Sequence, residues 1–184
     1  MLQNIYEQQS DSEYTVPNYH ILYGEIDDKI VKDACEWIVE ANLENSHPNL
    51  HLVINSVGGS LTSAWSLIDF MSTSRIAIST YGVGQTASAG LLLLMSGTKE
   101  HRFASQNLSI MSHQFEGGYE DSYHNISSMN IEYKNTHDRY LKHYIKCTGL
   151  SEKKVTNKLL SPTNKWMTSH EALLYNLIDN IFYV

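Results

Sequence analysis

Hydrophobic and polar positions along the chain change repeatedly between a strand-like and a helix-like pattern. The stretch YHILYGEI, from residue 19, predicts a strand closed by Gly24. Asp27 and Asp28 are suited to cap a helix directly after it. The apolar residues of this helix recur at helical spacing: Ile30, Val31, Ala34, Cys35, Ile38 and Val39.

A second and a third strand–helix unit follow. The run LHLVIN, residues 50–55, predicts a buried strand, which leads through the turn SVGGS into a helix. The apolar positions of that helix are Leu61, Ala64, Leu67, Ile68 and Met71. Residues 75–81 alternate as a strand does, and residues 88–95 predict a helix that Gly97 ends. The stretches HRFA and LSIMS predict two further short strands.

The last third of the chain is mainly helical. Residues 119–148 predict one long helix ended by Gly149, and it is polar for its length, so we expect it to project and to pack on another chain. A short helix follows Ser151, and Pro162 breaks it. Thr168 and Glu171 form a capping-box pattern for a last helix, and NLIDNIFYV predicts a closing strand.

Strands that alternate with helices indicate an α/β fold with a mostly parallel sheet. In such sheets, functional sites form where strands end and helices begin. Two junctions of this kind stand out, at residues 57–60 and 82–88.

Length and composition limit the classes of protein that this chain can belong to. Its 184 residues suit one domain, 18–184, preceded by a polar and aperiodic arm, 1–17. A net charge of −7 with no basic block argues against a nucleic-acid partner. The first residues lack a signal-peptide pattern, and the longest apolar run, residues 89–95, is too short to span a membrane. Two widely separated cysteines suit a reducing compartment, so we expect a cytoplasmic protein.

Ser88 is the first candidate for chemistry, and it has two interpretations. It follows a glycine-rich strand exit and opens a helix, whose N-terminal partial positive charge favours developing negative charge nearby. It is thus a candidate nucleophile, but serine is also a common helix cap. The surrounding T-A-S-A-G is not the G-x-S-x-G motif of many serine hydrolases, because Thr86 takes the place of the first glycine.

Two further features could complete a serine-type site. Gly58 and Gly59 lie between a strand and a helix, where they form either a loop of N–H donors or an ordinary tight turn. His113 ends a short strand in IMSHQFEGG, a placement that suits a side chain projecting into a cleft. No H-E-x-x-H or C-x-x-C motif occurs, so we expect no metal site. The pattern alone does not bring these residues together.

Four segments, in order, resemble the Clp protease proteolytic subunit (ClpP) family. They are INSVGGSLTSAWSLIDFM, GVGQTASAGLLLLMSG, IMSHQFEGGYED and WMTSHEALLYNLIDNI. Gly59 precedes Ser88 by 29 residues and His113 follows it by 25, spacings that are similar to those of the family. The resemblance covers about residues 18–184.

The resemblance implies a role for each matching residue. Ser88 falls on the nucleophile, His113 on the general base, and Gly59 and Ala89 on the backbone N–H groups of the oxyanion hole. The positions at which backbone groups pair with an extended substrate peptide are Leu61, Glu116 and Gly118. No cofactor is implied for the subunit itself.

The resemblance also implies a fold and an assembly. The fold is a crotonase-like α/β domain with a projecting handle helix, which suits the long polar helix predicted above. Seven subunits form a ring, and two rings stack through their handles around a closed chamber. A ring-shaped AAA+ ATPase unfolds polypeptide substrates and threads them in, and the arm at residues 1–17 is expected to line the axial entrance.

The chain departs from the family pattern at several positions. Asn164 stands where the family has its catalytic Asp, Pro162-Thr163 replaces a charged pair that helps to couple the rings, Val57 replaces a Pro, and Ala89 a Met. The Asn amide can hold the imidazole of His113, but it carries no charge to offset the imidazolium. Asn164 is therefore compatible with a slower triad, a site driven mainly by the Ser–His dyad, or an inactive subunit.

Three functions remain open on this basis. The first is a serine-type endopeptidase subunit of an ATP-dependent Clp protease, in homomeric or mixed rings. The second is a non-catalytic structural or regulatory subunit of a mixed ring. The third is a crotonase-type acyl-CoA enzyme that uses the same pair of N–H groups, for which fold analogy is the only support.

Overall fold

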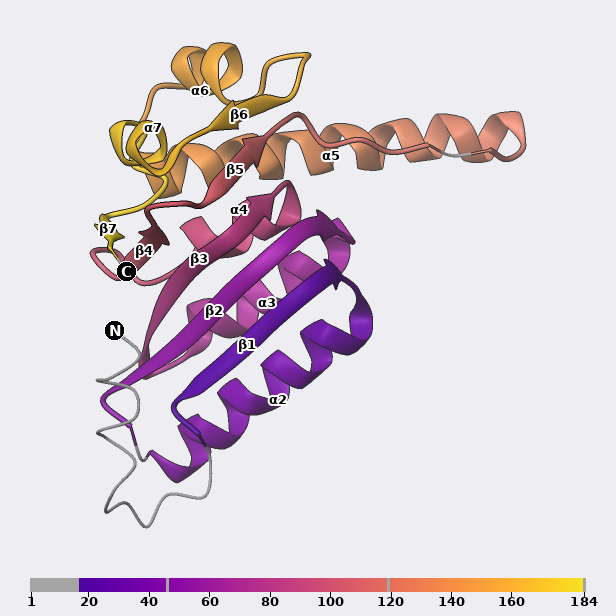
Figure 1. Cartoon of the computed structure of the whole chain (residues 1–184). Coiled ribbons are helices and arrows are strands. Elements are labelled where there is room, and N and C mark those ends of the chain that lie inside the picture. The colour runs from indigo at the N-terminus through magenta and orange to yellow at the C-terminus, as the bar shows by residue number, and fades with distance from the viewer. Residues whose placement is uncertain (1–16, 46, 119, 184) are drawn as a thin grey trace.

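A computed structural model describes residues 17–45, 47–118 and 120–183 (Figure 1). The predicted N-terminal arm, 1–17, lies outside the described residues except for Pro17. The strands are β1 (Tyr19–Ile26), β2 (Asn49–Gly59), β3 (Ala77–Ala87), β4 (Arg102–Ser105), β5 (Ser109–Ser112), β6 (Lys165–Met167) and β7 (Asn180–Phe182). The helices are α2 (Asp28–Glu44), α3 (Leu61–Thr73), α4 (Ala89–Met95), α5 (Tyr123–Thr148), α6 (Glu152–Lys158) and α7 (Ser169–Leu174).

The strands form one seven-stranded sheet in the order β1-β2-β3-β4-β7, and β5 pairs with both β3 and β6. All of these pairings are parallel except β5 with β6, so the predicted mostly parallel α/β sheet is confirmed. The helices that connect β1, β2 and β3 lie along one side of these strands (Figure 1). Parallel strands need such crossovers, which explains the alternating pattern of the sequence.

Strand β3 changes its neighbour halfway along its length. Its first half pairs with β4 up to Gly82, whereas residues 85–87 pair with β5. The turn of the chain between the halves includes Gly84, whose φ of 63° suits a glycine. This change carries the end of β3 away from β4 and places it beside β5, where the candidate site lies.

Several predicted boundaries were wrong. Gly24 lies within β1, at a register shift, and does not close the strand. Strands β2 and β3 continue to Gly59 and Ala87, because their glycine-rich ends still pair with neighbouring strands. Helix α5 begins at Tyr123, and β6 was not predicted because three residues are too few to show a period. The capping box of Thr168 with Glu171 and the Gly149 cap of α5 are confirmed.

Helix α4 and a partly buried ion pair anchor the centre of the domain. Residues 91–94, four consecutive leucines, are all fully buried, so α4 is fixed on every face. Arg102 on β4 binds Asp179 through its Nη2, 2.6 Å from Oδ1, and through its Nε, 2.8 Å from Oδ2. Burial favours the neutral carboxyl, but the hydrogen bonds and charge of Arg102 outweigh it and lower the pKa of Asp179. The pair ties β4 to the segment before β7.

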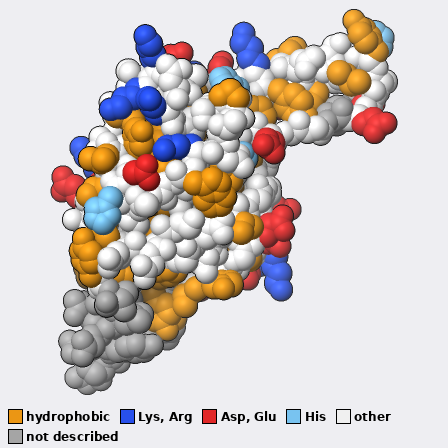
Figure 2. Space-filling view, turned by 45° about the horizontal axis from the view of Figure 1, so that its top comes forward, with side chains coloured by type: hydrophobic (Ala, Val, Ile, Leu, Met, Phe, Trp, Pro, Cys, Tyr) orange, Lys and Arg blue, Asp and Glu red, His pale blue; other side chains and the backbone are white. Residues whose placement is uncertain are grey.

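Helix α5 projects well beyond the rest of the domain, as predicted (Figure 1). Its buried residues all lie in its last nine positions: Tyr140, Tyr144 and Thr148. The projecting part carries exposed apolar side chains, including Tyr123, Ile126 and Ile131, and Figure 2 shows hydrophobic groups along this arm. Packing of this arm on another chain stays a prediction.

Candidate active site

Strand pairing brings Ser88 and His113 together. Ala87, the last residue of β3, pairs in parallel with Met111 of β5, and the N–H of Ser88 donates to the carbonyl of Met111 at 2.9 Å. Ser88 and His113 therefore both leave the carboxyl ends of neighbouring strands. The Nε2 of His113 lies 2.7 Å from the Oγ of Ser88, within hydrogen-bonding distance.

The backbone of Ser88 differs from that of an ordinary helix cap. Ser88 occupies the cap position of α4, but its side chain makes no capping hydrogen bond. Its dihedral angles are φ 54° and ψ −121°, a conformation that a residue other than glycine adopts only with strain. A strained serine on a sharp strand-to-helix turn presents its Oγ at the edge of the sheet, the arrangement found in serine hydrolases of the α/β type.

The glycine pair at the end of β2 lies against this turn. A Cβ on Gly58 would lie 2.7 Å from the Cβ of Ser88 and 3.2 Å from the backbone N of Ala89. A Cβ on Gly59 would collide with the backbone carbonyl of Ile26. Only glycine at position 58 lets the end of β2 come so close to the backbone of Ser88 and Ala89. The tight-turn interpretation is incomplete, because both glycines also belong to β2. The structure thus brings Gly58 to Ser88 and Ala89, whereas Gly59 packs against Ile26 of β1.

His113 is held by its two sequence neighbours. The Oγ of Ser112 donates to the carbonyl of Leu159 at 2.7 Å and lies 2.8 Å from the hydroxyl of Tyr144. Gln114 donates through Nε2 to the carbonyl of Leu160 at 2.9 Å. Because burial raises the pKa of Tyr144 to about 12, its hydroxyl stays protonated and donates to Ser112. The sequence analysis missed these supports, although Tyr140 and Tyr144 share the i, i+4 spacing of a buried helix face.

The other ring nitrogen of His113 has no hydrogen-bond partner among the described residues. This Nδ1 is buried, and in a triad it would donate to the third member. The pairing of Ser112 with Lys165 places Asn164 next in register to His113, but Asn164 is exposed and no hydrogen bond joins it to the described residues. The Oε1 of Glu116 lies 3.6 Å from Nδ1. The structure therefore does not join Asn164 to the Ser88–His113 pair.

The loop after His113 rests on helix α5. The ring of Phe115 contacts the rings of Tyr133 and His137, with centroids 6.1 Å and 6.5 Å apart. Gly118, at the end of this loop, is exposed, and Leu61 is the half-buried first residue of α3, directly after the glycine pair. The residues predicted to pair with substrate thus lie on the two segments that flank Ser88 in the sheet.

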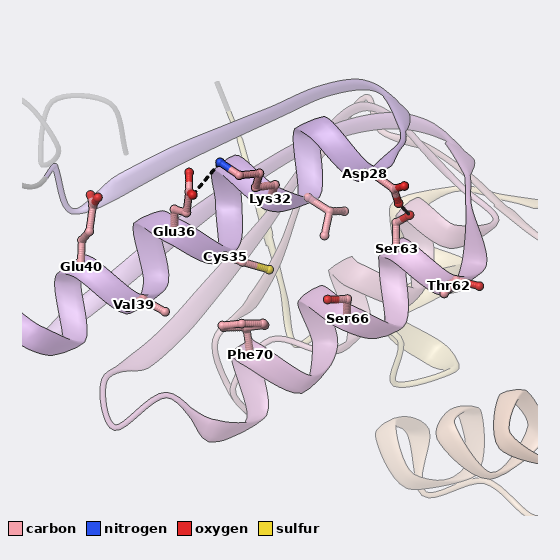
Figure 3. Close-up of a pocket in the computed structure, with 11 residues that line it drawn as sticks. Asp28, Lys32, Cys35, Glu36, Val39, Glu40, Thr62, Ser63, Ser66 and Phe70 are labelled. Carbon is pink, nitrogen blue, oxygen red and sulfur yellow. Dashed lines mark hydrogen bonds and ion pairs between the residues drawn. The ribbon is translucent and has the colours of Figure 1, made fainter.

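A separate groove lies between α2 and α3 and has no part in this site. It has a volume of about 640 Å³, and Figure 3 shows Cys35 and Val39 facing Phe70 across it. Burial raises the pKa of Cys35, which keeps the thiol protonated and a weak nucleophile. No histidine is among the residues that line this groove.

The part of the chain that the structure describes contains neither a cluster of metal ligands nor a membrane-spanning helix. No three His, Cys, Asp or Glu side chains there lie close enough together to hold a metal ion. None of the helices described is both long and apolar enough to cross a membrane. Both cysteines are free.

The fold and site define an α/β protein with a serine–histidine pair at the carboxyl edge of a parallel sheet. Comparison with known sequences makes this specific: a family model described as Clp protease matches residues 10–184. The chain belongs to the Clp protease family, which consists of peptidases, and it has the fold of that family.

Named relatives agree with this assignment. The ATP-dependent Clp protease proteolytic subunit 2 of Corynebacterium diphtheriae is 32% identical over 157 residues, which cover 85% of this chain and 78% of the relative. Subunit 2 of Nocardia farcinica is 33% identical, covering 85% and 76%. Subunit 1 of Corynebacterium jeikeium is 30% identical, covering 87% and 84%. These matches give no support to the acyl-CoA alternative.

Proposed function

We propose that this chain is a serine-type endopeptidase subunit of an ATP-dependent Clp protease. The observation that carries the proposal is the 2.7 Å distance between the Nε2 of His113 and the Oγ of Ser88. The strained backbone of Ser88 supports it, because a cap would not need that conformation. The family assignment supplies the peptide bond as the substrate.

In the proposed reaction, Ser88 attacks the carbonyl carbon of the scissile peptide bond. His113 accepts the hydroxyl proton through Nε2 and then donates it to the leaving amine. A water molecule, activated by the same nitrogen, hydrolyses the resulting acyl-enzyme and restores Ser88. Both proton transfers use one atom of His113, so the fixed position of that ring is essential to the mechanism.

The developing oxyanion is assigned to the backbone N–H groups of Gly59 and Ala89. The close approach of Gly58, the neighbour of Gly59, to the backbone N of Ala89 supports this assignment, since the two donors must converge on one oxygen. The extended substrate is assigned to backbone groups of Leu61, Glu116 and Gly118, on the segments on either side of Ser88.

The proposal extends to the assembly. Heptameric rings, stacked through α5, are supported by the projection of that helix and its exposed apolar residues. Polypeptide substrates would be delivered by an AAA+ unfoldase ring, in keeping with the words ATP-dependent in the names of the relatives. Residues 1–17 would line the axial entrance of a cytoplasmic particle. Both homomeric and mixed rings are compatible with the proposal.

The test is active-site labelling of the assembled particle. A fluorophosphonate should label Ser88 of the wild-type chain, and the particle should cleave a short fluorogenic peptide. Ser88→Ala should abolish both signals while the particle still assembles. An assembled wild-type particle that takes no label at Ser88 would falsify the proposal.

A second candidate, a non-catalytic subunit of a mixed ring, is favoured by one observation. The Nδ1 of His113 lacks a hydrogen-bond partner among the described residues, and Asn164 does not contact it. This candidate predicts that a mixed particle carrying Ser88→Ala in this chain cleaves peptides as fast as the wild-type particle.

A further inference from the structure

The Nδ1 of His113 lacks the acidic partner that the family pattern places beside it, because Asn164 stands where the family has its Asp. Only 14% of the His113 side chain is exposed, and its Nδ1 is buried without a hydrogen-bond partner among the described residues. When His113 takes the proton of Ser88, the ring becomes a cation in this partly desolvated place. A neighbouring anion would lower the free energy of that state.

The carboxylate of Glu116 lies close enough to His113 to act as this anion. The Oε1 of Glu116 is 3.6 Å from Nδ1, an ion-pair distance but too long for a hydrogen bond. Glu116 follows His113 by three residues in a loop that Phe115 holds against α5, so its backbone is supported close to the ring. Its side chain is 81% exposed and has the freedom to close the remaining gap.

We infer that Glu116, rather than Asn164, is the residue that positions His113 and offsets its charge during catalysis. The inference rests on the proposed serine-peptidase function. Asn164 is neutral and exposed, and it makes no hydrogen bond to His113. The side chain of Glu116 thus adds a role to the backbone contact with substrate that was expected of this residue.

The physical argument predicts which kinetic constant changes. In the proposed reaction the ring of His113 gains its positive charge when it takes the proton of Ser88, so its attraction to Glu116 develops in the transition state. An interaction confined to the transition state raises kcat and leaves KM unchanged. Because the carboxylate is largely exposed, water and salt weaken its effect.

The test compares four variants of the full chain in the assembled particle, with a short fluorogenic peptide as substrate. Glu116→Gln should lower kcat about fivefold with KM unchanged, the size expected of one exposed ion pair. Glu116→Asp, which keeps the charge, should retain more activity than Glu116→Gln. Glu120→Gln, an equal change of charge in the same exposed loop, should match the wild type. Asn164→Ala should lose less than Glu116→Gln.

Salt provides a second readout that a purely structural role of Glu116 would not produce. Raising the ionic strength from about 0.05 M to about 1 M should bring the kcat of the wild type towards that of Glu116→Gln, since screening acts on the ion pair. The kcat of Glu116→Gln should respond less.

Two results would overturn the inference. One is a Glu116→Gln particle with wild-type kcat, and the other is a larger loss for Asn164→Ala than for Glu116→Gln. Labelling separates the failure of this inference from that of the proposed function. If the fluorophosphonate labels Ser88 of the wild type but Glu116→Gln has no effect, only the role of Glu116 is wrong. If Ser88 takes no label, the proposed function itself fails.

Discussion

The hydroxyl of Tyr144 donates to the Oγ of Ser112 at 2.8 Å, and this buried bond joins the base of the projecting helix to the residue before His113. The Oγ of Ser112 in turn donates a hydrogen bond to the carbonyl of Leu159 at 2.7 Å. The end of β5 is therefore tied to α5 and to the residue that follows α6. These bonds fix the end of β5, directly before His113, to two other parts of the fold.

This chain of bonds predicts a graded loss of stability. Tyr144→Phe should lower the free energy of unfolding by about 1 kcal/mol, since one buried hydrogen bond is lost. Ser112→Ala should cost about 2 kcal/mol, because it leaves both the Tyr144 hydroxyl and the Leu159 carbonyl without this partner. Chemical denaturation measures both. Ser109→Ala, the same substitution at an exposed position of the same strand, is the control, and an equal cost at both serines would contradict the prediction.

The strained backbone of Ser88 predicts that glycine is more stable than alanine at this position. Ser88→Gly should be more stable than Ser88→Ala by about 1 kcal/mol, because glycine adopts a positive φ without strain. Both variants lose the hydroxyl and should be inactive, so the comparison isolates the backbone. Denaturation midpoints of the two variants provide the measurement. If the alanine variant is as stable as the glycine variant, Ser88 carries no strain.

Crowding at Gly58 predicts a loss of both stability and activity. Gly58→Ala should cost more stability than Gly24→Ala by about 1–3 kcal/mol, because a Cβ at position 58 meets Ser88 whereas one at position 24 meets nothing within 4 Å. The two glycines have similar φ values, 103° and 107°, so the backbone penalty is matched. Peptide cleavage should fall at least about tenfold in Gly58→Ala alone, since displacement of a nucleophile is costly.

The buried ring of His143 predicts how stability depends on pH. Burial, and to a lesser degree Lys146, lowers the pKa of His143 to about 4. The Oγ of Ser96 donates its only hydrogen to the carbonyl of Leu92. It therefore accepts the hydrogen bond from the Nε2 of His143, at 2.8 Å. In the unfolded chain the ring takes up a proton near its ordinary pKa of about 6.5. The unfolded state therefore binds more protons between these two values.

Stability should consequently fall as pH decreases from about 6.5 to about 4, by on the order of 3 kcal/mol for this one group. Above about 6.5 both states are neutral at this position and the contribution is constant. Urea denaturation between pH 7 and 4 tests the slope. His143→Gln should reduce it, although the variant is less stable at pH 7. An unchanged slope in that variant would show that other groups govern the acid sensitivity.

The sequence alone was enough for the class of fold and for most of the elements. Helical and strand periods, glycine ends and capping residues depend on near neighbours in the chain, so α2, α3 and the capping box of Thr168 could be predicted. The four segments around Gly59, Ser88, His113 and Glu171 were enough to indicate the family, because their order and spacing are specific together. Short or glycine-rich segments such as β6 and the end of β3 have too few alternating apolar residues to be predicted as strands.

Only the tertiary structure decided how the candidate residues meet. The distance between Ser88 and His113 follows from the register of Ala87 with Met111, which no local period encodes. The positive φ of Ser88, which no capping bond accompanies, occurs at the turn between β3 and the buried helix α4, and no local pattern of residues predicts it. The same holds for the exposed Asn164 and for Glu116 beside the ring. Side-chain contacts of this kind depend on the strand register and on the packing of distant segments, and three-dimensional geometry alone reveals them.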